Sequence, residues 1–370
     1  MSNTERPGAD ISGLIFKALE DSQDRDPRGH LGCSIIGREC DREIWYTWRW
    51  AKSPDFPGRI LRLFRRGHEE EPNVVKDLRS LGAEVHNADP KTGQQFRVTD
   101  IGGHLGGSLD GAIANVPGFG PTWMVLEIKT SGSKPFAKLV KDGVEKTKPE
   151  HFAQMMLYMR GTGMKKALYL AVCKDNDDIY TEVVDFDKAT ADAAFEKAKG
   201  IVEATKPPSK ISDNPSWWKC KFCNHKPHCQ GDDAPEVNCR TCVHATPEID
   251  EDRHGLWTCS KWKKGLNQAE QQAGCDEHLY IPGMLNFAEA VDADPEDGWI
   301  EYKSEQGVFF RNSGKSYAKM TDKHDQQGAG TPWESDDIHT LGAKVLTDDP
   351  LLESIRRNFG PTKIETNKKP

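Results

Sequence analysis

The chain has 370 residues, of which 36% are hydrophobic and 29% are charged. It is polar for a globular protein, but it carries too much apolar sequence for a disordered one. No apolar run approaches the roughly 18 residues of a membrane-spanning helix, and the N-terminus lacks a signal core. We therefore expect an intracellular (cytoplasmic) protein with no membrane partner. The net charge of -8 argues against a surface that binds nucleic acid everywhere, but it permits a local basic groove.

The length suggests two domains, or one domain with sizeable appendages. Residues 1–30 are polar, and we expect them to be flexible. The spacing of Ile44, Trp45 and Trp48 indicates a helix. A second helix is predicted over 60–81. Four arginines at and just before its start fit either a phosphate-contacting surface or a solvated face: Arg59, Arg62, Arg65 and Arg66.

The pattern then changes to strands, followed by alternating helices and strands. A stretch rich in Gly, Ser and Lys, SGSKPFAKLVK, reads as a loop suited to a phosphate backbone. The remaining elements predicted in this part are strands at 96–100, 105–116, 123–130, 167–173 and 180–186 and helices at 149–161 and 188–205. This order predicts a mixed α/β (α+β) fold, in which helices flank a central mixed sheet.

A cysteine-rich segment follows Pro208. In the tail we expect strands at 298–302 and 307–312 and a loop at 326–330. The predicted domain organisation is a flexible N-terminus (1–30), a main domain (31–232), a metal-binding module (233–285) and a C-terminal region without an assigned role (286–370).

Three charged residues stand out within the predicted sheet. Asp110 follows a Gly-rich apolar strand, and the next strand carries Glu127 and Lys129 as E-I-K. Side chains alternate along a strand, so Glu127 and Lys129 point to one face, and Asp110 can reach Glu127 if the strands pair. Two converging carboxylates are hard ligands for Mg²⁺ or Mn²⁺. Alone, the pattern is equally typical of an edge strand with solvated charges.

The chemistry that such a set favours is phosphodiester hydrolysis. A bound metal polarises the phosphate and lowers the pKa of a bound water. A neighbouring lysine can orient or deprotonate that water, or offset developing charge. Two flanking helices add to the pattern. One carries Glu71 four residues after Gly67, and the other carries Gln154 and Tyr158 one turn apart, hence on one face.

These residues, in this order, resemble the RecB-like branch of the PD-(D/E)xK nucleases, which includes lambda-type exonuclease, AddB-type helicase–nucleases and CRISPR-associated exonucleases. The resemblance covers about residues 30–205 and implies a restriction-endonuclease-like fold. It also implies that Glu71, Asp110, Glu127 and the Ile128 carbonyl hold the metal. Lys129 would serve the nucleophile, and Gln154 and Tyr158 would support the site or the DNA. His68 is an alternative to Glu71, and Leu109 stands where the family has its proline.

The function that the resemblance implies is a metal-dependent DNA exonuclease, a hydrolase acting on ester bonds in recombination, repair or replication, and of phage type. Its partner would be DNA, with a helicase or a single-strand annealing protein as a further partner, because the chain has no GxxxxGK[ST] motif of its own. Two alternatives stay open. One is a catalytically weak DNA-binding recombination module, and the other is a zinc-cluster interaction protein whose D…ExK match is accidental.

The first cysteine set is Cys220, Cys223 and Cys229, a C-x2-C-x5-C spacing that predicts metal ligands. The resemblance implies a [4Fe–4S] cluster closed by one N-terminal cysteine, Cys40 in preference to Cys33. The alternative is zinc bound by the same thiolates, which His225 and His228 could join.

A second set comprises Cys239, Cys242, Cys259 and Cys275. Four thiolates suit tetrahedral Zn²⁺ and predict a small zinc-binding module, in which His278 or His244 is an alternative ligand. Aromatic and lysine residues near this set fit either base stacking or a small core. They are Trp257, Trp262, Lys261, Lys263 and Lys264.

Overall fold

The computed structural model describes residues 9–250, 252, 254–317 and 331–346. The chain divides into two compact units, each assembled from several stretches of sequence. Unit 1 comprises residues 1–44, 53–203 and 247–256, and unit 2 comprises residues 45–52, 204–246 and 257–370. Each unit is described by itself.

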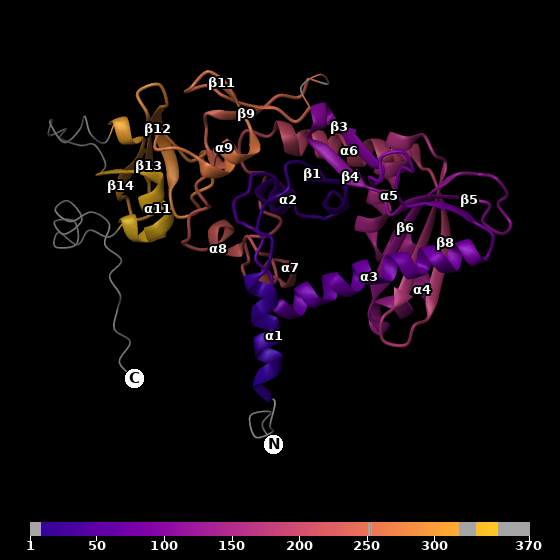
Figure 1. The fold of residues 1–370 in the computed structure, drawn as a ribbon. Coiled ribbons are helices and arrows are strands. Elements are labelled where there is room, and N and C mark those ends of the chain that lie inside the picture. Colours follow the sequence, from indigo (N-terminus) through magenta and orange to yellow (C-terminus); the bar gives the residue numbers. More distant parts are fainter. Residues whose placement is uncertain (1–8, 251, 253, 318–330, 347–370) are drawn as a thin grey trace. The chain divides into compact units, whose positions relative to one another are not determined.

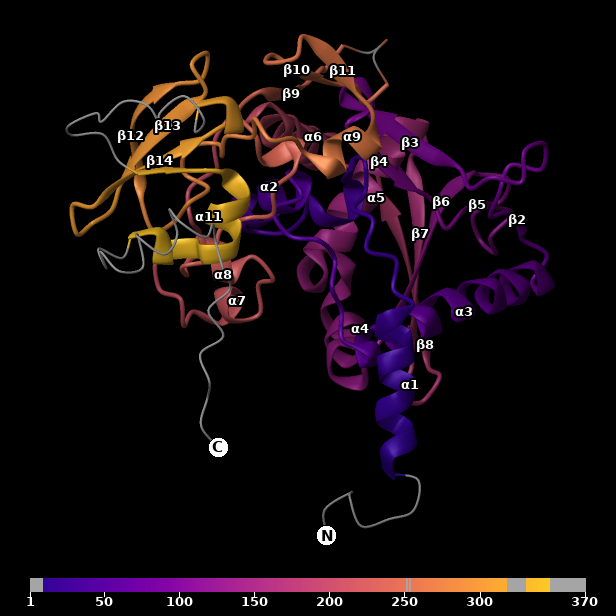
Figure 2. The same ribbon diagram turned by 60° about the vertical axis from the view of Figure 1, so that its left-hand side comes forward.

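Unit 1 contains a five-stranded mixed sheet in the order β2-β5-β6-β7-β8 (Figures 1 and 2). Only the β6–β7 pair is parallel. The strands are β2 (Glu84–His86), β5 (Gly111–Ala114), β6 (Met124–Ser131), β7 (Lys166–Cys173) and β8 (Ile179–Asp185). A smaller sheet has the order β1-β4-β3, with β1 (Leu31–Gly32), β3 (Arg97–Asp100) and β4 (Leu105–Ser108).

The helices of this part of the chain are α1 (Ala9–Asp21), α2 (Asp41–Trp48), α3 (Gly58–Ser80), α4 (Ser133–Thr147), α5 (Pro149–Thr162) and α6 (Lys188–Glu203). One face of the large sheet packs on α3, whose Val74, Val75 and Leu78 share a buried core with Ile113 and Leu126. Alternation along β6 places its odd-numbered residues on the opposite face. There the α5 residue His151 hydrogen-bonds to Tyr169 of β7. The predicted mixed α/β fold is confirmed.

Helix α1 lies within the segment that we expected to be flexible. It contacts the start of α3, where the Gly58 N–H donates to Glu20 Oε1 at 2.7 Å. A Cβ at Gly58 would lie 2.3 Å from the Phe16 carbonyl oxygen, so only glycine allows this approach. The polar composition of residues 1–30 suggested flexibility, whereas contacts with α3 stabilise helix α1.

Two other expectations are corrected. The strand expected over 105–116 is two strands, β4 and β5, which belong to different sheets. The Leu109 N–H still bonds to Phe96 O, and the chain changes sheet directly afterwards, at Asp110. The segment expected to be a loop after β6 is helix α4. Its Gly and Lys content suggested a loop, but Phe136, Leu139 and Val144 form a buried face.

Unit 2 contains a three-stranded and a four-stranded sheet. The first has the order β11-β10-β9, with β9 (Ala245–Pro247), β10 (Trp257–Cys259) and β11 (Lys264–Leu266). The second has the order β12-β13-β14-β15, with β12 (Glu289–Asp294), β13 (Trp299–Lys303), β14 (Phe309–Ser313) and β15 (Thr331–Trp333). Strands β13 and β14 match the two predicted for the tail, whereas the loop predicted at 326–330 lies outside the described residues.

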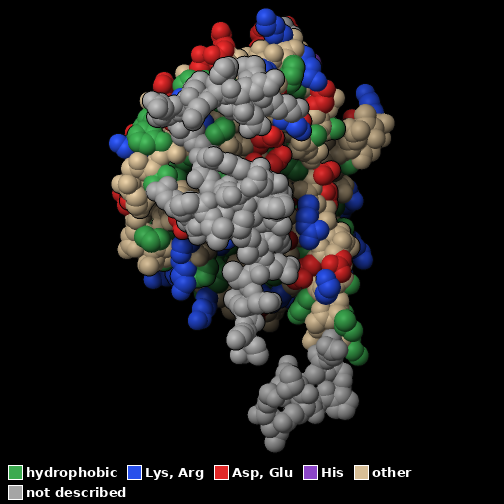
Figure 3. Space-filling model, turned by 90° about the vertical axis from the view of Figure 1, so that its left-hand side faces the viewer, with side chains coloured by type: hydrophobic (Ala, Val, Ile, Leu, Met, Phe, Trp, Pro, Cys, Tyr) green, Lys and Arg blue, Asp and Glu red, His purple; other side chains and the backbone are tan. Residues whose placement is uncertain are grey.

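The remaining helices are short: α7 (Trp218–Lys221), α8 (Lys226–Cys229), α9 (Gln268–Ala273) and α11 (Ser335–Leu341). Within the described ranges no helix is long and apolar enough to cross a membrane. On the part of the face that Figure 3 colours, both Lys or Arg and Asp or Glu side chains are visible.

Candidate active site

Strand pairing brings the three charged residues of the predicted site together. Strands β5 and β6 are antiparallel with Gly111 opposite Leu126, so Asp110 enters the sheet beside Glu127. The Ile128 N–H donates to Asp110 Oδ2 at 2.7 Å, which fixes the carboxylate. Lys129 Nζ lies 3.7 Å from the same oxygen and forms an ion pair with Glu127. We call Asp110, Glu127 and Lys129 the carboxylate centre.

Glu127 has no exposed surface. Its Oε2 has no hydrogen-bond partner among the described residues, which is uncommon for a buried carboxylate. Burial, and then repulsion from Asp110 and Glu71, raises its pKa to about 7 against the opposing attraction of Lys129. A buried oxygen without a donor is a suitable ligand for a cation.

Lys129 is the cation of the centre. Burial alone would lower its pKa, but the Glu127 and Asp110 carboxylates outweigh this and raise the pKa above its ordinary value. Its side chain keeps 26% of its surface exposed. Nζ also donates to the Ile128 carbonyl at 3.2 Å. The ammonium group is therefore held between both carboxylates while it still reaches solvent.

Glu71 lies on α3, directly before Pro72. A proline has no N–H, so position 72 donates no helical bond to the His68 carbonyl. Burial, and then repulsion from Asp110, raises the pKa of Glu71, whereas His68 and Lys129 act in the opposite direction. Glu71 therefore interacts electrostatically with Asp110 and Lys129 of the carboxylate centre, and His68 interacts electrostatically with Glu71.

The donor set suits a hard divalent cation, since it offers two carboxylates and the Ile128 carbonyl. Across the described residues, however, no group of three or more His, Cys, Asp and Glu side chains is arranged as a ready-made metal site. Glu71 therefore interacts with the centre through its charge without completing a three-carboxylate cage. Ligand roles for these residues stay predictions.

Gln154 and Tyr158 are joined as their spacing suggested. Gln154 Nε2 donates to Tyr158 Oη at 3.1 Å, and Tyr158 Oη donates to the Ser108 carbonyl at 2.9 Å. A Cβ at Gly107 would lie 2.6 Å from Tyr158 Oη. The glycine therefore lets the phenol reach the backbone two residues before Asp110.

Three residues near the centre were not predicted from the sequence as part of the site. His151 precedes Gln154 by three residues on α5, and burial followed by the charge of Lys129 lowers its pKa to about 3. Tyr169 lies opposite Glu127 in the β6–β7 register. Cys33, which is 1% exposed, interacts with the charge of Glu127. The i, i+3, i+7 spacing of His151, Gln154 and Tyr158 was a usable signal in the sequence.

The arginines of α3 are all exposed. Arg66 Nη2 donates to the Lys174 carbonyl at 2.6 Å, and Arg65 lies 3.8 Å from Glu69. Two of the four arginines in the predicted cluster 59–66 therefore already have protein partners, and phosphate contact stays a prediction.

The residues predicted for the iron–sulfur cluster fall in both units. Cys40 belongs to unit 1, whereas Cys220, Cys223 and Cys229 belong to unit 2. The nearby His225 uses both ring nitrogens, one with Thr47 Oγ1 at 2.9 Å and one with His228 Nε2 at 3.2 Å. These bonds argue against His225 as a metal ligand, and the [4Fe–4S] cluster stays a prediction.

The second cysteine set lies within unit 2, where Cys239, Cys242, Cys259 and Cys275 line one pocket. None of the ten cysteines, which all lie within the described residues, forms a disulfide.

Comparison with known proteins gives weak likenesses only. No family model matches the chain, and no curated protein matches it. Among solved structures, LHK-Exo in complex with dAMP shares 17% sequence identity at a TM-score of 0.35, and the match covers 51% of this chain and 90% of that one. The alkaline exonuclease LHK-Exo from Laribacter hongkongensis gives the same identity, coverage and TM-score.

Proposed function

We propose that the chain is a divalent-metal-dependent nuclease that hydrolyses DNA phosphodiesters at the carboxylate centre. The observation that carries this proposal is the arrangement of Asp110 and Glu127 around Lys129. One carboxylate is fully buried with an oxygen that makes no hydrogen bond, and the cation beside it is partly exposed. Structural ion pairs seldom leave a buried carboxylate oxygen without a donor, because that burial is costly.

Each protein group has a distinct part in this proposal. Asp110, held by the Ile128 N–H, and Glu127 would bind Mg²⁺ or Mn²⁺ together with the Ile128 carbonyl, and Glu71 would add charge from α3. When bound, the metal supplies Lewis acidity and an activated water. Lys129, held between both carboxylates, would orient or deprotonate the attacking water, or offset negative charge that develops on the phosphate.

Gln154 and Tyr158 support the centre from α5. Their hydrogen bonds reach the Ser108 carbonyl, and so hold the backbone that delivers Asp110. The restriction-endonuclease-like fold and the exonuclease mode follow from the resemblance of the sequence motifs. The same resemblance supports a role in recombination, repair or replication of phage type. It also supports a helicase or annealing protein as a partner.

An assay with linear and circular duplex DNA tests the proposal. The 5′ and 3′ ends of the linear substrate carry different labels, and Mg²⁺, Mn²⁺ or EDTA is added. We expect metal-dependent loss of label from linear DNA only. Lys129→Met should slow cleavage by about 10³-fold, an order of magnitude typical for removal of one charge-stabilising group.

The control is Lys188→Ala, which alters an 80%-exposed lysine of the same unit and should leave cleavage unchanged. Undiminished cleavage by Lys129→Met would refute the assigned centre. Wild-type protein that binds DNA without cutting it under either metal would favour the recombination module instead. Cleavage of the circle would replace the exonuclease mode by an endonuclease mode.

A further inference from the structure

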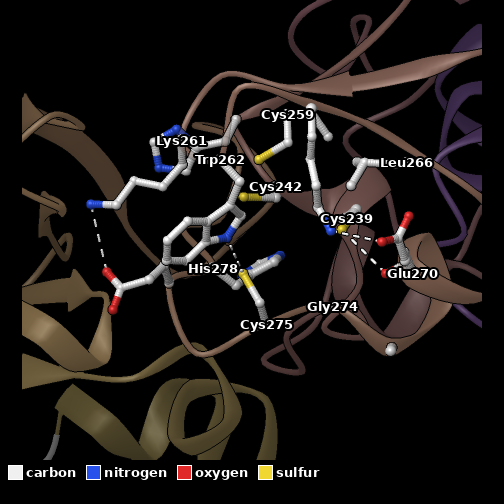
Figure 4. Close-up of a pocket in the computed structure, with 15 residues that line it drawn as sticks. Cys239, Cys242, Cys259, Lys261, Trp262, Leu266, Glu270, Gly274, Cys275 and His278 are labelled. Carbon is white, nitrogen blue, oxygen red and sulfur yellow. Dashed lines mark hydrogen bonds and ion pairs between the residues drawn. The ribbon is translucent and has the colours of Figure 1, made fainter.

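A pocket in unit 2 collects four cysteines from separate elements (Figure 4). Cys239 and Cys242 flank the 3₁₀ turn Cys239–Thr241, Cys259 ends β10, and Cys275 follows α9. The cavity measures about 180 Å³. The first and last of these cysteines, Cys239 and Cys275, are 36 residues apart in sequence. The fold, rather than one local motif, brings them to the same place.

The four cysteine side chains line the same cavity. Four cysteine sulfurs around one cavity are a ligand set typical of structural Zn²⁺ sites, in which the metal binds them as thiolates.

N–H donors already face two of these sulfurs. The backbone N–H groups of Leu279 and His244 face Cys242. Trp262 Nε1 donates to Cys275 Sγ at 3.5 Å. N–H donors of this kind stabilise negative charge on sulfur and orient it toward a metal.

A buried imidazole supplies an independent sign of a ligand. His244 lines the pocket and is 7% exposed. Its Nδ1 hydrogen-bonds to Ser260 Oγ at 3.3 Å, whereas its Nε2 makes no hydrogen bond within the described part of the chain. By contrast, His278 uses both nitrogens, with Thr241 Oγ1 at 3.0 Å and Ser335 Oγ at 2.8 Å. His278 is therefore excluded as a ligand in this arrangement.

We propose that Cys239, Cys242, Cys259 and Cys275 bind one Zn²⁺ tetrahedrally, as a structural centre of unit 2. The side chains are not yet arranged as a metal site among the described residues. Rotation about χ1 would let each sulfur turn toward a metal. The centre would tie the 3₁₀ turn, the β10–β11 hairpin and the end of α9 together. It does not depend on the nuclease proposal, because the carboxylate centre lies in unit 1.

The first test measures zinc content by plasma mass spectrometry on full-length protein purified under reducing conditions. We expect Cys242→Ser and Cys259→Ser each to lose one equivalent per chain relative to wild type. Cys173→Ser, which changes a buried cysteine of β7, should lose none, and Cys220→Ser should keep this equivalent. Equal zinc in Cys259→Ser and wild type overturns the proposal, as does iron with sulfide in place of zinc.

The second test needs no variant, in case substitution prevents folding. Alkylation of wild-type protein is mapped by peptide mass spectrometry, with and without a zinc chelator. Cys275 is exposed, so as a free thiol it should react fast. With zinc bound, its alkylation should be at least about tenfold slower until the chelator is added. Rapid alkylation without chelator, or a disulfide among the four cysteines, contradicts zinc ligation.

Discussion

The two units bury different charged groups. Unit 1 buries an acid, Glu127, against one lysine, and leaves an oxygen without a hydrogen bond. Unit 2 buries two arginines, Arg49 and Arg240, among tryptophan rings. Arg240 Cζ lies 3.7 Å from the centroid of the Trp50 ring.

Arg240 Nε donates to Gln271 Oε1 at 2.9 Å, and Nη1 donates to the Trp48 carbonyl at 3.2 Å. The bonding capacity of this guanidinium is used within the protein, which is typical of a structural role. The carboxylate centre retains unused capacity, which is typical of a site that binds something else. We call the arginines and their rings the arginine–tryptophan core. Its rings are those of Trp45, Trp48, Trp50 and Trp257.

Asp110→Asn has the largest expected effect. It tests whether the carboxylate centre of unit 1 is a functional site. The amide oxygen can still accept the Ile128 N–H, so the fold should persist, but the metal loses a charged ligand. We expect cleavage to fall by about 10³-fold, measured as a single-turnover rate. The urea midpoint should stay unchanged.

The matched control is Asp185→Asn, at an aspartate with 78% of its side chain exposed. It should affect neither rate nor midpoint. If Asp110→Asn lowers the urea midpoint and the rate in parallel, the centre is a structural ion pair rather than a site.

Arg240→Met tests the other side of the comparison. The change leaves the Gln271 and Trp48 oxygens without their donors and removes the stacked cation. We expect a loss of about 3 kcal/mol in the free energy of unfolding, measured by urea titration, with a smaller change in activity. Arg25→Met, at a half-exposed arginine, serves as control. A loss of less than about 1 kcal/mol would show that the buried cation is not required for stability.

Gly107→Ala probes the support of the carboxylate centre by overpacking. The new methyl group meets Tyr158 Oη, so the ring must shift away from Ser108. We expect about 2 kcal/mol of destabilisation together with reduced cleavage. Gly200→Ala is the control, because a Cβ there has nothing within 4 Å. It should be neutral or slightly stabilising in a helix. Equal behaviour of the two variants would rule out the proposed steric constraint.

Tyr158→Phe is the mildest change. It tests whether Tyr158 supports the carboxylate centre beyond its contribution to stability. It removes one hydroxyl that links Gln154 to the Ser108 carbonyl. We expect a loss of about 1 kcal/mol in stability and a fall in cleavage rate larger than that loss explains. The comparison uses rates at a temperature where both proteins are fully folded. A rate equal to wild type would remove Tyr158 from the support of the centre.

The regular part of unit 1 was predictable from the sequence because its strands are apolar and its helices amphipathic. The β6 strand and helices α3, α5 and α6 begin and end within a few residues of their expected positions. The proximity of Asp110 to Glu127 followed from alternation and one assumed pairing. Those inferences depend only on local geometry.

The failures arose where tertiary contacts determine structure. Helix α4 was expected to be a loop, because Gly132, the serines and the lysines of its first part outweighed an apolar face that becomes evident only when it is buried. His151 was missed because its relation to Lys129 depends on how α5 packs on β6 and β7. The domain-level grouping of distant segments, such as Trp45–Lys52 with Ala204–Thr246, leaves no trace in local composition.

The connection between β6 and β7 has a consequence for the order in which the centre is assembled. Strands β5 and β6 pair across the connection 115–123, whereas the parallel partner β7 follows only after α4 and α5. Contacts that close long segments form more slowly than hairpins. We therefore expect the hairpin that joins Asp110 to β6 to form early, while Glu127 is still hydrated. Burial of its carboxylate would follow in a later step, when β7 pairs with β6 and brings Tyr169 opposite Glu127.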